Sequence, residues 1–525
     1  MLEKKQETEE GLMPEKVSSL KKGIFIPSFA IIGGAAVLGL VNNQGLTRIT
    51  NQIFSWSLSN FGWLYQIISV VTLFLVVYLT FSKFGNIRLG GEDAEPQFSF
   101  VKWFAMALTG GIATGIVTWG VNEPIIYFGN IYGELDKIGL EPGEPITAIF
   151  ALARSYYNWT FVPYAMYSLC GLAVAYVYFN RGKSLSVTAT LEPLFGEKIQ
   201  KGIWSSIIDT LSLLAMALGL AASLGAGLAL VGAGLEVSYG ISQGPIIWLA
   251  IVVVITATYS ISSILGLKKG IRWLADANAK IYYILLALLF FTGPTVYILR
   301  TSTVSLGYWL DNFWQWGLDP GDIGGSALVQ WWTLYDWAIW IAYAPLMGLF
   351  LAVIAYGRTI REFMIINWIL PSFFSVVWFG VLGSTALYWQ QEGTVDLIGV
   401  IEQSGAVGGL WALLDHIPLG GLFVPAVILA LVLSFATAAN SMTRTIAALC
   451  TEGLKFDEEP AKWHKLLWGI SIAAIAYFMV TYAGGEQGVD GVKFLSAAGG
   501  SFVLFIFVLQ VISTMKMFFI DDIIE

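Results

Sequence analysis

Long apolar segments alternate with short polar or glycine- and proline-rich breaks along most of the chain. Segments such as 246–256 are apolar on every side, which is typical of helices embedded in lipid and unlike the alternating pattern of membrane β-strands. A membrane-spanning helix needs about 20 residues. The pattern therefore predicts an all-α fold with twelve spans, near residues 24–42, 58–81, 100–128, 147–178, 203–235, 245–265, 271–299, 329–356, 360–388, 419–445, 464–483 and 493–516.

Composition agrees with a polytopic membrane protein. Of the 525 residues, 56% are hydrophobic and only 12% are charged, with a mean hydropathy of +0.71. Soluble domains carry about 25% charged residues, so an ordinary soluble enzyme and a disordered chain are excluded. The net charge of −8 also argues against nucleic acid as a partner.

Cysteine and histidine are scarce. Cys170 and Cys450 lie far apart in apolar segments, which gives no indication of a disulfide framework. His416 and His464 are the only histidines, so sites built from several imidazoles, such as haem or zinc centres, are excluded. We expect no cofactor and no enzymatic activity.

Lysine and arginine orient the predicted spans. If both termini are cytoplasmic, most of these residues fall on the cytoplasmic segments, and the other side receives only Arg48, Lys137, Arg300 and Lys493. This asymmetry satisfies the positive-inside rule. It predicts a multi-pass protein of the cytoplasmic membrane, with a polar N-terminal tail at 1–22 and a short C-terminal tail at 517–525.

Two external segments are more than turns. At 303–316, leucine and aromatic residues recur at helical spacing between polar residues, which predicts a helix along the outer interface. The external loop at 390–417 contains several glycines, and its role stays open.

Glycine and proline interrupt two spans. Glycine residues at 110–115 and the pair Glu123-Pro124 break the third span, and Pro345 and Gly348 break the eighth, five spans later. Interruptions at corresponding places in two halves point to the binding site of a transporter. Close helix packing through small residues is the alternative explanation for each stretch alone.

Aromatic residues fall deep in the fourth and eighth spans. Trp159, Tyr164 and Tyr167 lie in the fourth, while Trp340 and Tyr343 share one helix face in the eighth. Two such faces would form a box for a quaternary ammonium group, held by cation–π attraction of about 2 kcal/mol per desolvated contact. On spacing alone, an aromatic packing stripe remains the more common explanation.

Longer motifs resemble the betaine/choline/carnitine transporter family. Residues 332–340 read Trp-Thr-Leu-Tyr-Asp-Trp-Ala-Ile-Trp, and residues 357–363 read Gly-Arg-Thr-Ile-Arg-Glu-Phe. Supporting matches are Trp119-Gly120, Asn158-Trp159 with Pro163, Ser223-Leu224-Gly225 and Gly266-Leu267 with Lys269-Gly270. The matches run from the third span to the start of the ninth.

The resemblance implies a fold of two inverted five-helix repeats, alternating access and a homotrimer. The expected layout is a tail at 1–22, two N-terminal helices at 23–99, repeats at 100–300 and 329–516 separated by the external segment 301–328, and a tail at 517–525. The resemblance places the aromatic substrate site on Trp159, Tyr164, Tyr167, Ile339, Trp340 and Tyr343, with Met347 resembling a methionine of carnitine-type members.

Some residues depart from the family pattern. Betaine-type members have tryptophan where this chain has Tyr164, Ile339 and Tyr343, and isoleucine has no π face, so the box is weakened. Asp336 is unusual in the aromatic stretch and lies one turn from Trp340. It is a candidate for attracting a cation or taking up a proton, or else a carboxylate accommodated by water and the helix N-terminus.

Sodium coupling is uncertain. At one ion site of the family, sodium-driven members have hydroxyl residues where this chain has Met216 and Leu220. A thioether and an alkyl group are poor ligands for a hard cation. At the other, Thr437 keeps a hydroxyl next to Ala438, and Ile112 lies in an altered glycine motif; these two are the candidate ion ligands. Carnitine exchangers that do not use sodium have an arginine where this chain has Asn278.

The function indicated is secondary transport of a small quaternary-ammonium or zwitterionic solute of the glycine betaine, choline or carnitine type. A sodium-independent exchanger of carnitine type is the first alternative. A membrane channel or sensor that uses the same aromatic box is the alternative from another class.

Overall fold

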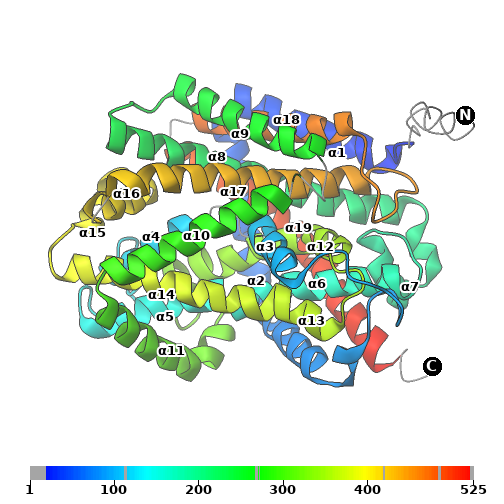
Figure 1. The fold of residues 1–525 in the computed structure, drawn as a ribbon, viewed down its shortest axis with the longest axis horizontal. Coiled ribbons are helices and arrows are strands. Elements are labelled where there is room, and N and C mark those ends of the chain that lie inside the picture. Colours follow the sequence, from blue (N-terminus) through cyan, green and yellow to red (C-terminus); the bar gives the residue numbers. More distant parts are fainter. Residues whose placement is uncertain are drawn as a thin grey trace, which may run out of the picture.

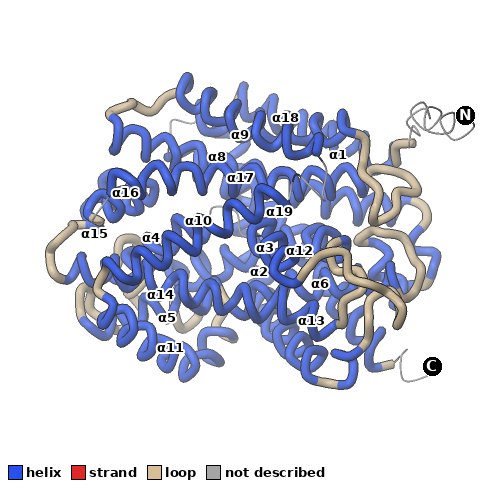
Figure 2. Tube along the Cα trace, in the orientation of Figure 1, coloured by secondary structure: helices blue, strands red, loops and turns tan. Residues whose placement is uncertain are grey.

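The computed structural model describes residues 19–111, 115–265, 270, 272–417, 420–482 and 486–520, and these ranges are almost entirely helical (Figures 1 and 2). They contain no β-strand, only isolated bridges. The main helices are α1 Lys22–Val41, α2 Asn43–Phe81, α3 Phe100–Gly111, α4 Gly115–Gly129, α5 Pro145–Trp159, α6 Phe161–Phe179, α8 Ile203–Tyr239, α9 Pro245–Leu265, α10 Arg272–Thr292, α11 Thr295–Gly317, α12 Tyr335–Val353, α14 Leu370–Gln391, α17 Gly420–Leu449, α18 Lys462–Tyr482 and α19 Glu486–Phe519. Shorter elements are η2 Lys83–Asn86, η3 Thr188–Leu191, α7 Glu192–Phe195, η4 Glu197–Gln200, α13 Ile360–Met364, α15 Leu397–Ser404, α16 Ala406–His416 and the π-helices η6 Ser326–Leu334 and η7 Ile365–Ile369.

The all-α, membrane-spanning class is confirmed. In the described ranges, eleven helices or helix pairs are long and apolar enough to cross a membrane, and they coincide with eleven of the twelve predicted spans. The remaining one, at 100–128, corresponds to α3 and α4, which are both too short to count alone. The count of twelve therefore stays a prediction.

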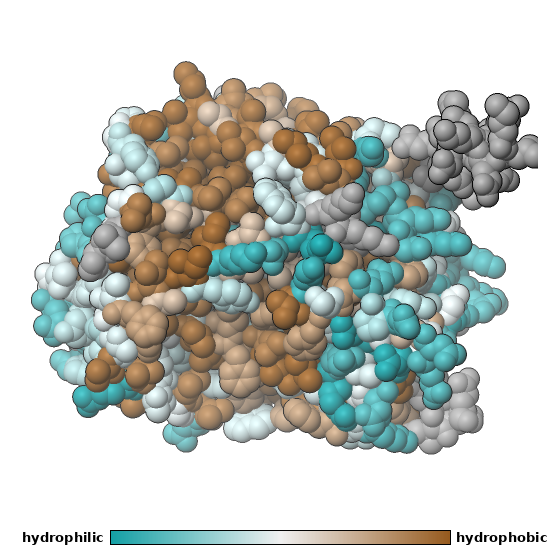
Figure 3. Space-filling model, in the orientation of Figure 1, coloured by the Kyte–Doolittle hydropathy of each residue, from teal (hydrophilic) through white to brown (hydrophobic). Residues whose placement is uncertain are grey.

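The molecule has polar ends and an apolar middle. Figure 3 shows apolar side chains over the middle of one face, with polar ones toward both ends. The start of α1 and the end of α19 lie at the same end of the bundle, while α15 and α16 lie at the opposite end (Figure 1). An apolar band between polar ends is what a lipid bilayer requires of a protein surface.

The predicted seventh span and external helix have a different boundary. α10 stops at Thr292 and α11 begins at Thr295, so the break lies at Gly293-Pro294 and not near residue 300. Proline lacks the amide hydrogen that would continue α10. α11 packs against the outer sides of α5 and α14 through residues such as Ile298, whose side chain is buried.

Two connecting segments are joined by main-chain hydrogen bonds. Leu89 N–H donates to the Arg358 carbonyl, Gly357 N–H to the Leu89 carbonyl, and Ile360 N–H to the Ile87 carbonyl, each at 2.9 Å. The Arg361 guanidinium, in α13, donates to the Thr80 carbonyl at 3.1 Å and so satisfies an otherwise unpaired group at the end of α2. We call residues 87–89 with 357–361 the paired strip.

Both cysteines are free and buried, in agreement with the absence of a predicted disulfide framework. From their spacing of four residues, Asp276 and Lys280 are expected to pair inside the bundle. They do pair, at 2.8 Å, but both side chains are largely exposed, so the pair does not lie inside it. A second ion-pair cluster has buried cations. Glu459 accepts from Arg444 Nε at 3.1 Å and from Lys465 Nζ at 2.9 Å, and both cations are at least 97% buried.

Candidate functional site

A cavity of about 190 Å³ lies between α4, α5, α6, α8, α12 and α16, with further contributions from α17 and α19. Six of the residues singled out from the sequence line it: Trp159, Tyr167, Asp336, Ile339, Trp340 and Tyr343. The structure thus brings together side chains from two segments that are far apart in the chain. Its wall also includes small residues of α8, which leave the space open.

Trp340 is the centre of the aromatic cluster. Its ring centroid lies 4.5 Å from that of Tyr167, 5.1 Å from Tyr164 and 6.3 Å from Trp159. The planes of Trp159 and Trp340 are tilted by 75°, so the two indoles form adjoining walls rather than a stack. Such mutually inclined faces can surround a cationic group with π electron density.

Trp159 is placed at a helix break. In a continuous α-helix, the amide of residue 163 would donate to the Trp159 carbonyl, four residues earlier. Pro163 has no amide hydrogen and cannot form this bond. The chain turns at Thr160 (φ −120°, ψ −118°), where α5 ends and α6 begins. This break projects the Trp159 indole into the cavity.

Close packing of α6 and α12 sets the distance between the two aromatic segments. A Cβ added at Gly348 of α12 would lie 2.7 Å from the main-chain carbon of Cys170, in α6. Only glycine allows the two backbones to approach this closely. The crossing holds Tyr164 and Tyr167 beside Trp340. α12 runs unbroken through Pro345 and Gly348, so the predicted break of the eighth span is wrong, and Gly348 is a packing contact.

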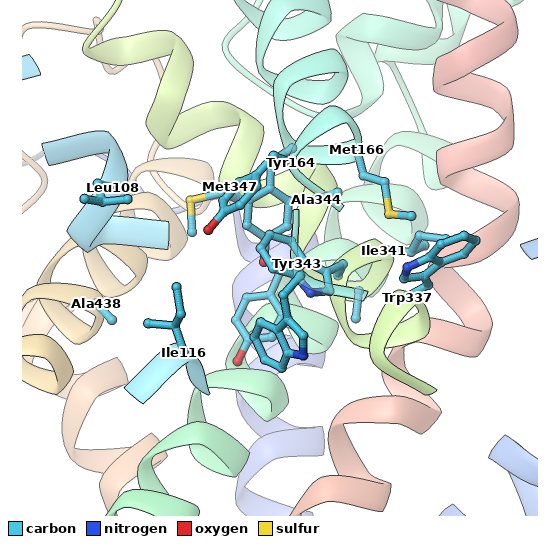
Figure 4. Close-up of a cluster of buried hydrophobic side chains, with 14 of the residues drawn as sticks. Leu108, Ile116, Tyr164, Met166, Trp337, Ile341, Tyr343, Ala344, Met347 and Ala438 are labelled. Atoms are coloured by element: carbon cyan, nitrogen blue, oxygen red, sulfur yellow. The ribbon is translucent and has the colours of Figure 1, made fainter. Parts of the chain in front are cut away.

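Tyr164 and Met347 lie behind the cavity wall. Neither lines the cavity, and both are buried. The Tyr164 hydroxyl is 3.0 Å from Ser375 Oγ, in α14. Figure 4 shows Tyr164, Met347 and Tyr343 on the same side of α12, whereas Trp337 and Ile341 point the other way. Tyr164 thus supports Trp340 from behind.

Asp336, Ile339, Trp340 and Tyr343 form one stripe of α12 along the cavity, at positions i, i+3, i+4 and i+7. Ile339 gives this wall an apolar patch in place of a ring. Asp336 is 8% exposed and lies in the first turn of α12, at one end of the stripe.

The candidate ion ligands differ in what the structure says of them. Thr437, in α17, is fully buried, and its hydroxyl donates to the Leu433 carbonyl of its own helix at 2.7 Å. Ile112 lies outside the described residues. Met216 and Leu220 are buried on α8, and Asn278 donates to Ser434 Oγ, in α17, at 2.7 Å.

Sequence reasoning missed a polar network behind Trp159. The Glu123 carboxylate, in α4, accepts hydrogen bonds from Trp159 Nε1 at 2.5 Å, Asn158 Nδ2 at 2.8 Å and Tyr127 Oη at 2.9 Å. From the sequence, the pair Glu123-Pro124 is assigned to a helix break, and the Glu123 side chain is given no role. A carboxylate inside an apolar span was the signal that could have identified it.

The network continues to Arg154, which is buried in α5. Arg154 Nη2 donates to Thr333 Oγ1 at 2.7 Å, and Thr333 Oγ1 donates to Asn158 Oδ1 at 2.8 Å. The Arg154 guanidinium also lies over the rings of Tyr157 and Trp316, at 5.6 and 5.0 Å. One hydrogen-bonded chain thus joins α4, α5 and η6, the segment that leads into α12.

The loop at 390–417 also contributes to the site. Ala406 and Val407 of α16 line the cavity. α16 is fixed to the bundle because Asn122 Nδ2 donates to the Ala406 carbonyl at 2.5 Å and Trp411 Nε1 donates to the Leu230 carbonyl at 2.9 Å. α16 therefore forms part of the cavity wall.

A polytopic helical bundle with an aromatic cavity between two distant segments, one of them broken at Thr160, has the construction of a solute transporter. The model of the BCCT, betaine/carnitine/choline family transporter, matches residues 23–522. The chain belongs to this family, as the motifs predicted, and is a multi-pass membrane transporter rather than an enzyme.

Several curated proteins are similar over almost the whole chain. A protein of Desulfitobacterium hafniense named "Probable glycine betaine transporter" is 31% identical over 91% of this chain and 93% of its own length. The glycine betaine transporter OpuD of Bacillus subtilis is 29% identical over 92% of each chain. The betaine/ectoine transporter LcoP of Corynebacterium glutamicum is 31% identical over 91% of this chain and 74% of its own.

Proposed function

We propose that this protein is a secondary transporter of a small quaternary-ammonium or related zwitterionic solute of the glycine betaine, choline or carnitine type, working by alternating access. The observation that carries the proposal is the cavity between the inclined indoles of Trp159 and Trp340, with Tyr167 and Tyr343 beside them. Neutral, electron-rich walls suit an ammonium group that cannot donate hydrogen bonds. The printed substrates of the similar proteins agree with this solute class.

The substrate site of the proposal is built in two layers. Trp159, Tyr167, Trp340 and Tyr343 contact the ammonium group, and Ile339 supplies an apolar wall. Tyr164 and Met347 act from behind, since they pack against the aromatic cluster without lining the cavity. Asp336 is the candidate charge or proton site, in the first turn of α12.

The break between α5 and α6 at Thr160 supports movement around this site. In the proposal, α3 and α4 together form the third of twelve spans. Two inverted five-helix repeats occupy 100–300 and 329–516, and both termini lie on the cytoplasmic side of the cytoplasmic membrane. The shared end of α1 and α19 supports an even number of crossings. A homotrimer, with α11 in its contacts, belongs to the same proposal.

Coupling is the open element of the transport cycle. Thr437 is the remaining hydroxyl ligand for sodium: its hydrogen is donated within α17, and its oxygen lone pairs stay available to a cation. Met216 and Leu220 bring no oxygen to a second site. These features favour weak sodium coupling, or exchange of one solute against another, as in a sodium-independent exchanger of carnitine type.

Uptake of labelled glycine betaine, choline and carnitine into proteoliposomes tests the proposal. We expect saturable uptake of at least one solute, and accelerated counterflow when the liposomes are preloaded with it. Uptake without saturation or counterflow would instead indicate a channel, and binding without any flux would indicate a sensor. Comparison with and without a sodium gradient separates symport from exchange.

A further inference from the structure

Glu123 is fully buried and does not line the cavity, yet its carboxylate is bonded to one of the cavity walls. Oxygen Oε2 accepts from the Trp159 indole, while Oε1 accepts from Asn158 and Tyr127. Any influence of Glu123 on a guest in the cavity therefore passes through Trp159 or through space.

A buried carboxylate is expensive unless it is paired. In the part of the chain that the structure describes, no lysine or arginine forms an ion pair with Glu123. The nearest compensation is Arg154, two side chains away through Thr333 and Asn158. The chain of hydrogen bonds therefore begins at the positively charged Arg154, behind the cavity wall, and ends at the Glu123 carboxylate, which is bonded to the Trp159 indole.

This polarity changes the property on which cation binding depends. An indole that donates its N–H to a carboxylate gains electron density in the ring, and cation–π attraction grows with the negative charge of the π face. Trp159 also lies at the end of α5, so its N–H bond is the contact that fixes the ring where the helix stops.

We propose that Glu123 is a positioning residue for cation recognition: it holds the Trp159 indole in the wall and makes its π face more negative. The inference rests on the proposed function, because it requires an ammonium guest. It assigns the preference for a positive charge over an uncharged group of equal shape to the Glu123–Trp159 pair.

Glu123→Gln tests this assignment with two probes of the same shape. Glycine betaine carries a trimethylammonium group, and 3,3-dimethylbutanoate has carbon in place of the nitrogen. We expect the substitution to lower the ratio of their affinities about tenfold, with less than a twofold change for dimethylbutanoate. A purely structural role would weaken both probes equally, and an unchanged ratio would overturn the proposal.

A double-mutant cycle tests whether the effect passes through the indole. In a Trp159→Phe background there is no N–H to donate, so Glu123→Gln should change the ratio less than twofold. Full additivity would overturn the proposal. If Glu123→Gln does not fold, Trp159→Phe alone decides: retention of the wild-type ratio would contradict it.

Glu134→Gln is the matched control. Glu134 accepts from the Trp332 indole at 3.1 Å, the same kind of bond, but neither residue lines the cavity. We expect the affinity ratio to be unchanged in this variant, and an equal fall would contradict a specific role of Glu123. Wild-type protein that binds none of glycine betaine, choline and carnitine would sink the proposed function itself, a result distinct from binding that Glu123→Gln leaves intact.

Discussion

Gly219 leaves the space that Tyr343 occupies in the cavity wall. A Cβ added at Gly219, in α8, would lie 2.6 Å from two ring carbons of Tyr343 and 2.9 Å from its hydroxyl. Carbon atoms in contact prefer 3.5–4.0 Å. In Gly219→Ala the Tyr343 ring must therefore retreat by about 1 Å or turn away.

The expected cost falls on binding more than on folding. Displacing one aromatic wall removes a cation–π contact of about 1–2 kcal/mol, which corresponds to roughly 5- to 30-fold weaker binding. Alanine in place of glycine inside a helix is favourable by about 1 kcal/mol, and this offsets part of the strain. We therefore expect a melting temperature close to that of the wild type.

Titration of tryptophan fluorescence with glycine betaine measures the affinity, and thermal unfolding in detergent measures stability. Gly33→Ala in α1 is the matched control, because an added Cβ there meets nothing within 4 Å. In a Tyr343→Leu background, Gly219→Ala should cause no further loss. Wild-type affinity in Gly219→Ala would refute the reasoning.

Four further substitutions, one of them a control, separate the other features. Trp340→Leu removes the central ring and should abolish detectable binding and lower the melting temperature, since large-to-small changes of buried aromatic residues cost about 3–5 kcal/mol; binding within threefold of the wild type would contradict the aromatic site. Glu459→Gln removes the half-exposed acid that two buried cations share and should cost about 1.5–3 kcal/mol in thermal unfolding, whereas Asp276→Asn, whose partner Lys280 is exposed, should cost less than about 0.5 kcal/mol; equal effects would be inconsistent with this argument from the burial of the cations. Thr437→Ala should remove any stimulation of uptake by a sodium gradient, and stimulation that persists would exclude this hydroxyl as an ion ligand.

Periodicity and composition predicted the helices well because lipid demands a continuous apolar surface and internally bonded backbone. The end of the seventh span was placed at residue 299 instead of at Gly293-Pro294. The four residues after Thr295 are apolar, like those of a membrane span, and this apolar pattern was given more weight than the proline. The predicted interruption of the third span falls on residues 112–114, outside the described residues. α3 and α4, on either side of them, are each too short for a length criterion that describes uninterrupted spans.

For the site, family motifs identified the residues, but not which of them line the cavity and which lie behind its wall. Trp159, Tyr167, Trp340 and Tyr343 line the cavity, whereas Tyr164 points to Ser375 behind it. Sequence spacing gives the face of a single helix, but it does not give the rotation of one helix against another. The Glu123 network depends on three elements meeting, which spacing along one chain segment cannot reveal.

The paired strip limits where the protein can bend. Main-chain bonds between 87–89 and 357–360 tie the turn after α12 to the segment before α3, and Arg361 adds the end of α2. Segments joined by these bonds are expected to move as one rigid body. The proposed alternating-access movement would then require bending in other segments. The kink at Thr160 and the loosely wound η6 flank the cavity and are suited to act as its joints.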